Sequence, residues 1–168
     1  MMMDSRNAAI ITLDNVEVIQ DAILDSYTSG ELLCEKVMDI ARIGLAAEML
    51  GLVKEVFERT VAYLKEREQF GVLIGTFQAL QHRAAIMYGE IELCKSIVIR
   101  GLKAIDDNDP QLPRFASLAK AKLGETVKLV TNEGIQMFGG IGVTDDEEVG
   151  FFLKRGRVAQ QTFGDANF

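Results

Sequence analysis

The chain has 168 residues, of which 48% are hydrophobic, and its formal net charge is −7. This apolar content is enough for a buried core and excludes wholesale disorder, which requires few apolar residues and a high net charge. The negative charge disfavours nucleic acid as a partner, because a phosphate backbone repels an acidic surface.

Signatures of several other classes of protein are missing from the sequence. The N-terminus lacks the cationic region and apolar run of a signal peptide, and no stretch of about 20 apolar residues is present to span a bilayer. We therefore expect a cytoplasmic protein without a membrane segment. His82 is the only histidine, so no zinc site is expected, and Cys34 and Cys94 are predicted to be buried thiols within apolar helices.

The first 30 residues have a different pattern from the rest of the chain. Residues 8–13 are apolar and β-favouring, residues 14–15 indicate a turn, and residues 16–18 indicate a second short extended piece. This pattern is typical of the edge of a β-region whose body is absent. We therefore assign residues 1–30 to a β-domain remnant and linker, and residues 31–168 to a second domain.

From about Glu31 the apolar residues recur with a helical period, and this helix is predicted to end near Arg67. One apolar stripe consists of Leu33, Val37, Ile40, Gly44 and Ala47, and the other of Leu45, Met49, Leu52 and Val56. A helix that is apolar on two faces is normally central in a bundle. Gly71 and Gly75 then bracket a loop.

Three more helices are predicted downstream. In residues 77–105 apolar side chains alternate spacings of three and four, which is the seam of a helix packed along a nearly antiparallel neighbour. The next helix runs from about Pro113 to Gly139, and a shorter one from about Asp145–Glu148 to Gln161. The face expected to be buried in the third helix comprises Phe115, Leu118, Ala119, Leu123, Val127 and Val130. Together these elements predict an all-α, up-and-down four-helix bundle with a short extended N-terminal segment.

Two segments contain candidate ligand-binding residues. Gln136–Gly142 holds three glycines in four positions at the end of a helix, which is more than a helix C-cap needs and would let a ligand approach the backbone closely. It is not a Rossmann fingerprint, because that motif opens a helix and this one closes a helix. Arg67 lies at a helix-to-loop junction, where it either complements the helix C-terminus or offers a planar fork to a phosphate.

Taken together, these segments resemble the acyl-CoA dehydrogenase family. The matching pieces, in chain order, are Asp39–Ala47 with Gly51-Leu52, Arg67–Gly71, Phe77-Gln78, Gln136–Gly142, and Gly142–Asp145 leading through Lys154–Arg157 to Phe163-Gly164. The resemblance covers nearly the whole chain, and Ile11–Leu24 looks like the exit from that family's middle β-domain. It implies the C-terminal helical part of an enzyme that oxidises acyl-CoA thioesters to 2,3-enoyl products with FAD as hydride acceptor. By this comparison the chain is too short to be the whole enzyme.

The resemblance also implies roles for individual residues. Those matching FAD contacts are Arg67, Phe70, Gln78, Gln136, Gly139 and Gly140, with Arg67 and Gln136–Gly140 reaching flavin held by a neighbouring subunit. Those matching segments along the acyl-CoA are Asp39, Arg42 and Gly164. The implied partners are an acyl-CoA substrate, an electron acceptor flavoprotein, and either further copies of the chain, as a dimer or tetramer, or a catalytic subunit in a heteromer.

The sequence departs from the family at the catalytic base. The family places a glutamate either directly before the glycine that matches Gly164 or at the position that matches Ala41, and here the first position is Phe163. Asp165 and Asp39, each two residues from one of these positions, are the candidate substitutes. Two hypotheses follow: an enzyme with a displaced base, or a non-catalytic subunit for oligomerisation and flavin contact. In either case we expect the chain alone to be inactive and not to retain FAD.

Overall fold

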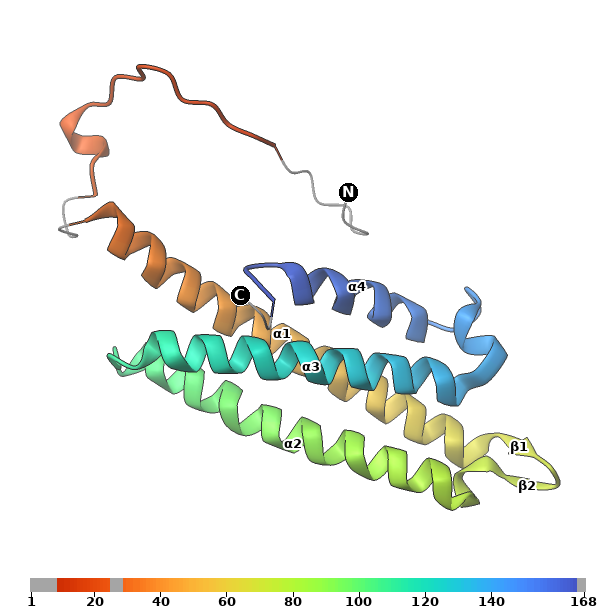
Figure 1. Cartoon of the computed structure of the whole chain (residues 1–168). Helices are drawn as coiled ribbons and strands as arrows, with labels where there is room; N and C mark the ends of the chain where they lie inside the picture. Colours follow the sequence, from red (N-terminus) through yellow and green to blue (C-terminus); the bar gives the residue numbers. More distant parts are fainter. Residues whose placement is uncertain (1–8, 25–28, 166–168) are drawn as a thin grey trace.

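The computed structural model describes residues 9–24 and 29–165, and the second of these segments forms a helical bundle (Figure 1). The helices are α1 (Gly30–Glu66), α2 (Gln78–Asp106), α3 (Leu112–Phe138) and α4 (Val149–Gln161). Between them lie strands β1 (Glu68–Gln69) and β2 (Val72–Leu73) and the 3-10 turns η2 (Ile74–Thr76) and η3 (Gly139–Val143), and η1 (Gln20–Ala22) precedes α1. The predicted all-α bundle is confirmed, with its helix boundaries close to those expected.

The predicted loop after α1 is a tight β-hairpin. Strands β1 and β2 pair antiparallel around a two-residue turn, Phe70 and Gly71, whose φ angles are 57° and 77°. Positive φ at both central residues is the type I′ geometry that matches strand twist. A Cβ on Gly75 would lie 2.6 Å from the carbonyl oxygen of Leu64, so the chain leaving the hairpin passes directly against α1. The segment that follows the hairpin is therefore packed against the end of α1, while the strands themselves are exposed.

Helices α1 and α3 form the centre of the bundle, since each packs against all three other helices, and α2 and α4 lie on either side of α3 (Figure 1). Glycines allow the closest approaches. A Cβ on Gly134 would lie 2.7 Å from Cγ1 of Val56 in α1, and one on Gly156 of α4 would lie 2.6 Å from Cγ1 of Val127. The second predicted stripe of α1 fills the core beside these contacts: Leu45, Met49, Leu52 and Val56 are all buried.

Some predicted buried positions are exposed instead. Leu118 is 51% exposed, because one residue further on Ala119, turned about 100° around the helix, occupies the core position. Cys34 is also exposed, whereas Cys94 is buried as predicted, and both thiols are free. The seam predicted for α2 is buried from Met87 to Gly101, whereas its first predicted residue, Phe77, is the N-cap of the helix and is exposed.

Two apolar regions are left uncovered by this bundle. In the first stripe of α1, Val37 and Ile40 are exposed together with the nearby Leu32. Residues 9–24 contain no strand and form an arm that bends and passes above the bundle in the view of Figure 1, clear of the helices. The exposed apolar side chains of this arm are Ile10, Ile11, Leu13, Val16, Val18, Ile19, Ile23 and Leu24. The predicted extended pieces therefore form no ladder with any described residue, and Ala8 lies outside the described residues.

Within the described ranges, no helix combines the length and the apolarity needed to cross a bilayer. The same part of the chain brings together no group of three or more His, Cys, Asp or Glu side chains that could hold a metal ion.

Candidate functional site

A pocket of about 540 Å³ lies where the hairpin meets the end of α3, and we call it the hairpin pocket. Five of the six residues predicted to contact FAD line it, namely Arg67, Phe70, Gln136, Gly139 and Gly140. The sixth, Gln78, is exposed at the first residue of α2 and is not part of the lining. Because α2 runs back along the bundle, α1 and α3 are parallel and their C-terminal ends meet, which brings these residues together across about 70 positions of sequence.

Arg67 is available to bind a ligand in the hairpin pocket. Its backbone is fixed, since its N–H donates to the Tyr63 carbonyl at 2.9 Å and its own carbonyl accepts from the Ile74 N–H at 2.9 Å. Its exposed guanidinium has no partner among the described residues. The other arginine of the lining, Arg83, is instead paired with Glu133. An unpaired guanidinium on a fixed backbone suits a phosphate, which it can bind through two parallel hydrogen bonds.

Aromatic side chains make up much of the remaining lining. Tyr63 stacks on Phe138 with ring centroids 4.4 Å apart, and its hydroxyl donates to the Phe138 carbonyl at 3.4 Å. Phe70, at the tip of the hairpin, meets Phe77 edge to face at 6.1 Å and is otherwise 89% exposed. An exposed aromatic ring at a pocket rim offers a large apolar surface to a planar ligand.

Two glycines of the Gln136–Gly142 segment are required by the fold, and a third is not. Gly139 has φ of 67°, which favours glycine, and a Cβ on Gly142 would lie 2.7 Å from Cβ of Phe138. Gly140 has neither constraint, because a Cβ there would meet no atom within 4 Å. The described fold therefore accounts for Gly139 and Gly142 but gives no reason for glycine at 140. Space beside the Gly140 backbone is what close approach of a ligand requires.

The three residues predicted to lie along an acyl-CoA also come together, at the opposite end of α1. Asp39 is only 5% exposed and accepts a hydrogen bond from Nη1 of Arg42 at 3.0 Å. Nε of Arg42 donates to the Phe163 carbonyl at 3.1 Å, directly before Gly164. Residues near the start of α1 and after the end of α4 thus form one cluster.

The two alternative base positions are close in sequence to this cluster. Ala41 directly precedes Arg42 in α1, and Phe163 accepts the Arg42 hydrogen bond through its carbonyl. Neither Ala41 nor Phe163 carries a titratable group. Of the substitutes, Asp39 is engaged with Arg42, and Asp165 is exposed at the edge of the cluster. A further residue, Lys120 of α3, donates to the Gly164 carbonyl and was not predicted from the sequence, although a lysine inside an apolar helical stripe was a signal that could have identified it.

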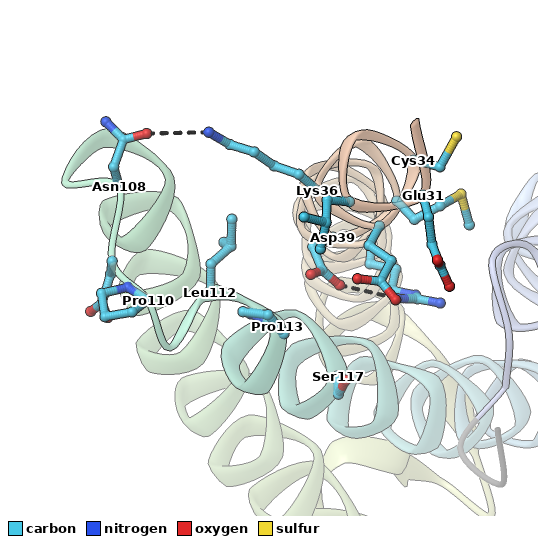
Figure 2. Close-up of a pocket in the computed structure, with 14 residues that line it drawn as sticks. Glu31, Cys34, Lys36, Asp39, Asn108, Pro110, Leu112, Pro113 and Ser117 are labelled. Carbon is cyan, nitrogen blue, oxygen red and sulfur yellow. Dashed lines mark hydrogen bonds and ion pairs between the residues drawn. The ribbon is translucent and has the colours of Figure 1, made fainter. Parts of the chain in front are cut away.

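A second pocket, of about 730 Å³, opens between the start of α1 and the α2–α3 loop (Figure 2). Its charged lining consists of Glu31, Glu35, Asp39 and Asp109 against Lys36 and Arg42. Figure 2 shows Lys36 reaching across toward Asn108, with Nζ and Oδ1 3.4 Å apart. The excess of carboxylates makes this pocket a poor site for a polyphosphate, and so the phosphates of a ligand held at Asp39 and Arg42 are expected to lie elsewhere.

The hairpin pocket and the Asp39–Arg42 cluster are far apart in one chain. Asp39 and Arg67 are separated by 28 residues of α1 and its C-cap. At roughly 1.5 Å per residue, this places them about 42 Å apart along the helix. A single ligand bound at one site therefore does not reach the other site of the same chain.

The chain is similar in both sequence and fold to acyl-CoA dehydrogenases. Residues 29–167 match the family model described as acyl-CoA dehydrogenase, C-terminal domain. The chain is 32% identical over 157 residues to the short/branched chain specific acyl-CoA dehydrogenase, mitochondrial, of Rattus norvegicus. This match spans 94% of this chain and 36% of that protein. The fold is similar to butyryl-CoA dehydrogenase from Megasphaera elsdenii, with a TM-score of 0.79 and 28% identity over 82% of this chain and 36% of that one. A chain from a structure described as electron transferring flavoprotein of Acidaminococcus fermentans has a TM-score of 0.79 and a sequence identity of 32%, over the same shares of the two chains.

Proposed function

Since the chain belongs to the acyl-CoA dehydrogenase family, as its C-terminal helical domain, we propose that it forms part of an FAD-dependent enzyme that dehydrogenates acyl-CoA thioesters at carbons 2 and 3. The observation that carries this proposal is the convergence of Arg67, Phe70 and Gln136–Gly140 on the hairpin pocket. These residues come from two segments about 70 positions apart in the sequence, and each has the chemistry that a flavin dinucleotide requires. The chain spans only 36% of the relative from Rattus norvegicus, so the other domains would supply the rest of the site.

The hairpin pocket fits one part of FAD. Arg67 would bind the pyrophosphate, Gly140 would let the backbone approach, and the Gln136 amide would add a polar contact beside them. The stacked pair Tyr63 and Phe138 would exclude water from this wall. When bound, FAD supplies the two-electron acceptor of the reaction.

The distance between the two sites supports an oligomer. Because Arg67 and Asp39 lie about 42 Å apart along α1, the flavin at one chain's hairpin pocket would serve the acyl-CoA site of a neighbouring subunit. Exposed apolar residues on α2, such as Ile86, Leu93 and Ile99, offer a surface for this association together with the uncovered stripe of α1. We propose a dimer or tetramer, with an electron acceptor flavoprotein as a further partner.

The exposed N-terminal arm supports the predicted domain division. Its apolar side chains have no cover in this chain, and a contiguous exposed apolar segment marks an interaction site. We propose that residues 1–30 complete the edge of a middle β-domain and connect it to the bundle at residues 31–168.

A second candidate function is a non-catalytic subunit that contributes flavin contacts and an oligomer interface. The observation that favours it is the pair Ala41 and Phe163, since both positions available to the base lie close in sequence to one cluster and neither holds a carboxylate. Turnover by the completed assembly distinguishes the two candidates.

Replacement of Arg67 by alanine should weaken FAD binding by about 10- to 100-fold, because charge-assisted hydrogen bonds to phosphate contribute about 1.5–3 kcal/mol. The measurement is a flavin titration of the chain co-expressed with the domains that complete it in its relatives. Arg114→Ala is the matched control, since Arg114 is exposed on α3 and lines neither pocket. Equal affinities of the two variants would exclude the hairpin pocket as a flavin site.

A further inference from the structure

Lys120 is a buried cation that the proposed reaction does not use. It lies in α3 and is only 4% exposed, and it is the one buried charged residue among the described residues of that helix. Its Nζ donates to the carbonyl of Gln160 at 2.8 Å and to that of Gly164 at 2.6 Å. Burial of an ammonium group is unfavourable unless it is hydrogen-bonded, so the hydrogen bonds to these two carbonyls offset the cost of burying Lys120.

The two carbonyls belong to the end of α4 and the turn that follows it. The last carbonyls of a helix lack partners within the helix, and the helix dipole favours a cation there. The turn itself is unusual, since Phe163 and Gly164 have φ angles of 62° and 96°. Positive φ is disfavoured for a phenylalanine, so surrounding contacts must hold this conformation.

A second cation, from a different helix, holds the same turn. Arg42 of α1 donates to the Phe163 carbonyl, and Lys120 of α3 donates to the next carbonyl along the chain. Successive carbonyls are thus fixed from two helices, and the residue that follows is Asp165. Burial lowers the pKa of Lys120, the charge of Asp165 opposes this shift, and that of Arg42 adds to it, so Asp165 is within electrostatic reach of the ammonium.

We propose that Lys120 is a positioning residue, which together with Arg42 fixes the Phe163–Asp165 turn and so determines where the Asp165 carboxylate stands relative to Asp39 and Arg42. The inference rests on the proposed function, because it places Asp165 at the acyl-CoA site. A neutral side chain at position 120 would leave two carbonyls without their donor and remove the cation from Asp165. The exposed lysines of α3 have no such role, and Lys128 is an example.

The turn can be tested in the full 168-residue chain by NMR, without any assay of activity. In Lys120→Met, the carbonyl ¹³C resonances of Gln160 and Gly164 should shift. The Thr162 amide, which donates to the Val158 carbonyl, should exchange with solvent about tenfold faster or more. Lys120→Arg should restore most of this protection, and the control Lys128→Met should change neither signal. Unchanged carbonyl shifts and Thr162 exchange in Lys120→Met would overturn the inference.

The wild-type chain gives an independent test in case Lys120→Met does not fold. Couplings across the hydrogen bonds, from ¹⁵Nζ of Lys120 to the carbonyl carbons of Gln160 and Gly164, should be detectable at low temperature. If Lys120 shows no coupling to either carbonyl while the structured amides of α4 are observed, the positioning role is wrong.

The catalytic consequence is tested in the assembly completed by the other domains that its relatives contain. Lys120→Met should lower kcat about tenfold with little change in KM. When combined with Asp165→Asn it should add no further loss, because both act through one carboxylate. Unchanged kcat in Lys120→Met would refute the inference and leave the proposed function intact. Absence of turnover in the wild-type assembly would refute the enzymatic function, and the NMR results would still decide the role of Lys120.

Discussion

The 168-residue chain alone should give no measurable dehydrogenation of acyl-CoA thioesters. The first reason is that its hairpin pocket offers FAD a single wall, built from Arg67, Phe70 and Gln136–Gly140. Binding so large a ligand requires enough contacts to offset its lost translational and rotational freedom, which costs at least about 4 kcal/mol. Absorbance near 450 nm and turnover of several acyl-CoAs by the purified chain are the measurements, and turnover by the chain alone would contradict the expectation.

The second reason is that neither position expected for the catalytic base holds a carboxylate. Ala41 and Phe163 cannot take up a proton, and general-base catalysis contributes a factor of about 10² to 10⁴. The two reasons are separated by co-expressing the chain with the domains that complete it in its relatives and measuring flavin content and turnover together. Flavin bound without turnover would support the non-catalytic subunit.

Turnover in that assembly would identify a displaced base. Asp165→Asn should then lower kcat by about 10²- to 10⁴-fold, because the amide cannot accept the proton. Asp146→Asn is the control, since Asp146 is exposed in the loop before α4 and away from the Asp39–Arg42 cluster. If Asp165→Asn retains full activity and Asp39→Asn does not, the base is Asp39.

Replacement of Leu123 by alanine should lower the free energy of unfolding by about 2–5 kcal/mol. Leu123 has no exposed surface and lies in the centre of the core formed by α3 with α1 and α2. Truncation removes buried methyl groups and leaves a cavity that the surrounding helices cannot fully close. Urea denaturation followed by circular dichroism measures the effect.

Leu118→Ala is the matched control for this experiment. The two leucines are in the same helix, so the change in helix propensity is identical, but Leu118 is half exposed. Its truncation should cost less than about 1 kcal/mol in the isolated chain. Similar losses for the two variants would show that the observed division of α3 into buried and exposed faces is wrong.

The sequence by itself determined the four helices and nearly all of their boundaries. The spacing of apolar residues is a local signal, and Pro113, Gly71 and Gly139 interrupt it where helices begin or end, so no knowledge of packing was needed. The same signal placed both Leu118 and Ala119 on the buried face, and this was wrong for Leu118, because adjacent residues point about 100° apart around a helix. Which of them entered the core depended on the position of the neighbouring helices.

The candidate sites show the same division. Residue types and their order along the chain indicated the ligand-binding segments, but only the tertiary structure brought Arg67 to Gln136 and Arg42 to Phe163. Only the structure distinguished Gly140, where the fold does not require glycine, from Gly139 and Gly142, where it does. Contacts between residues distant in sequence depend on how helices pack, and that packing is a property of the whole core rather than of any one segment.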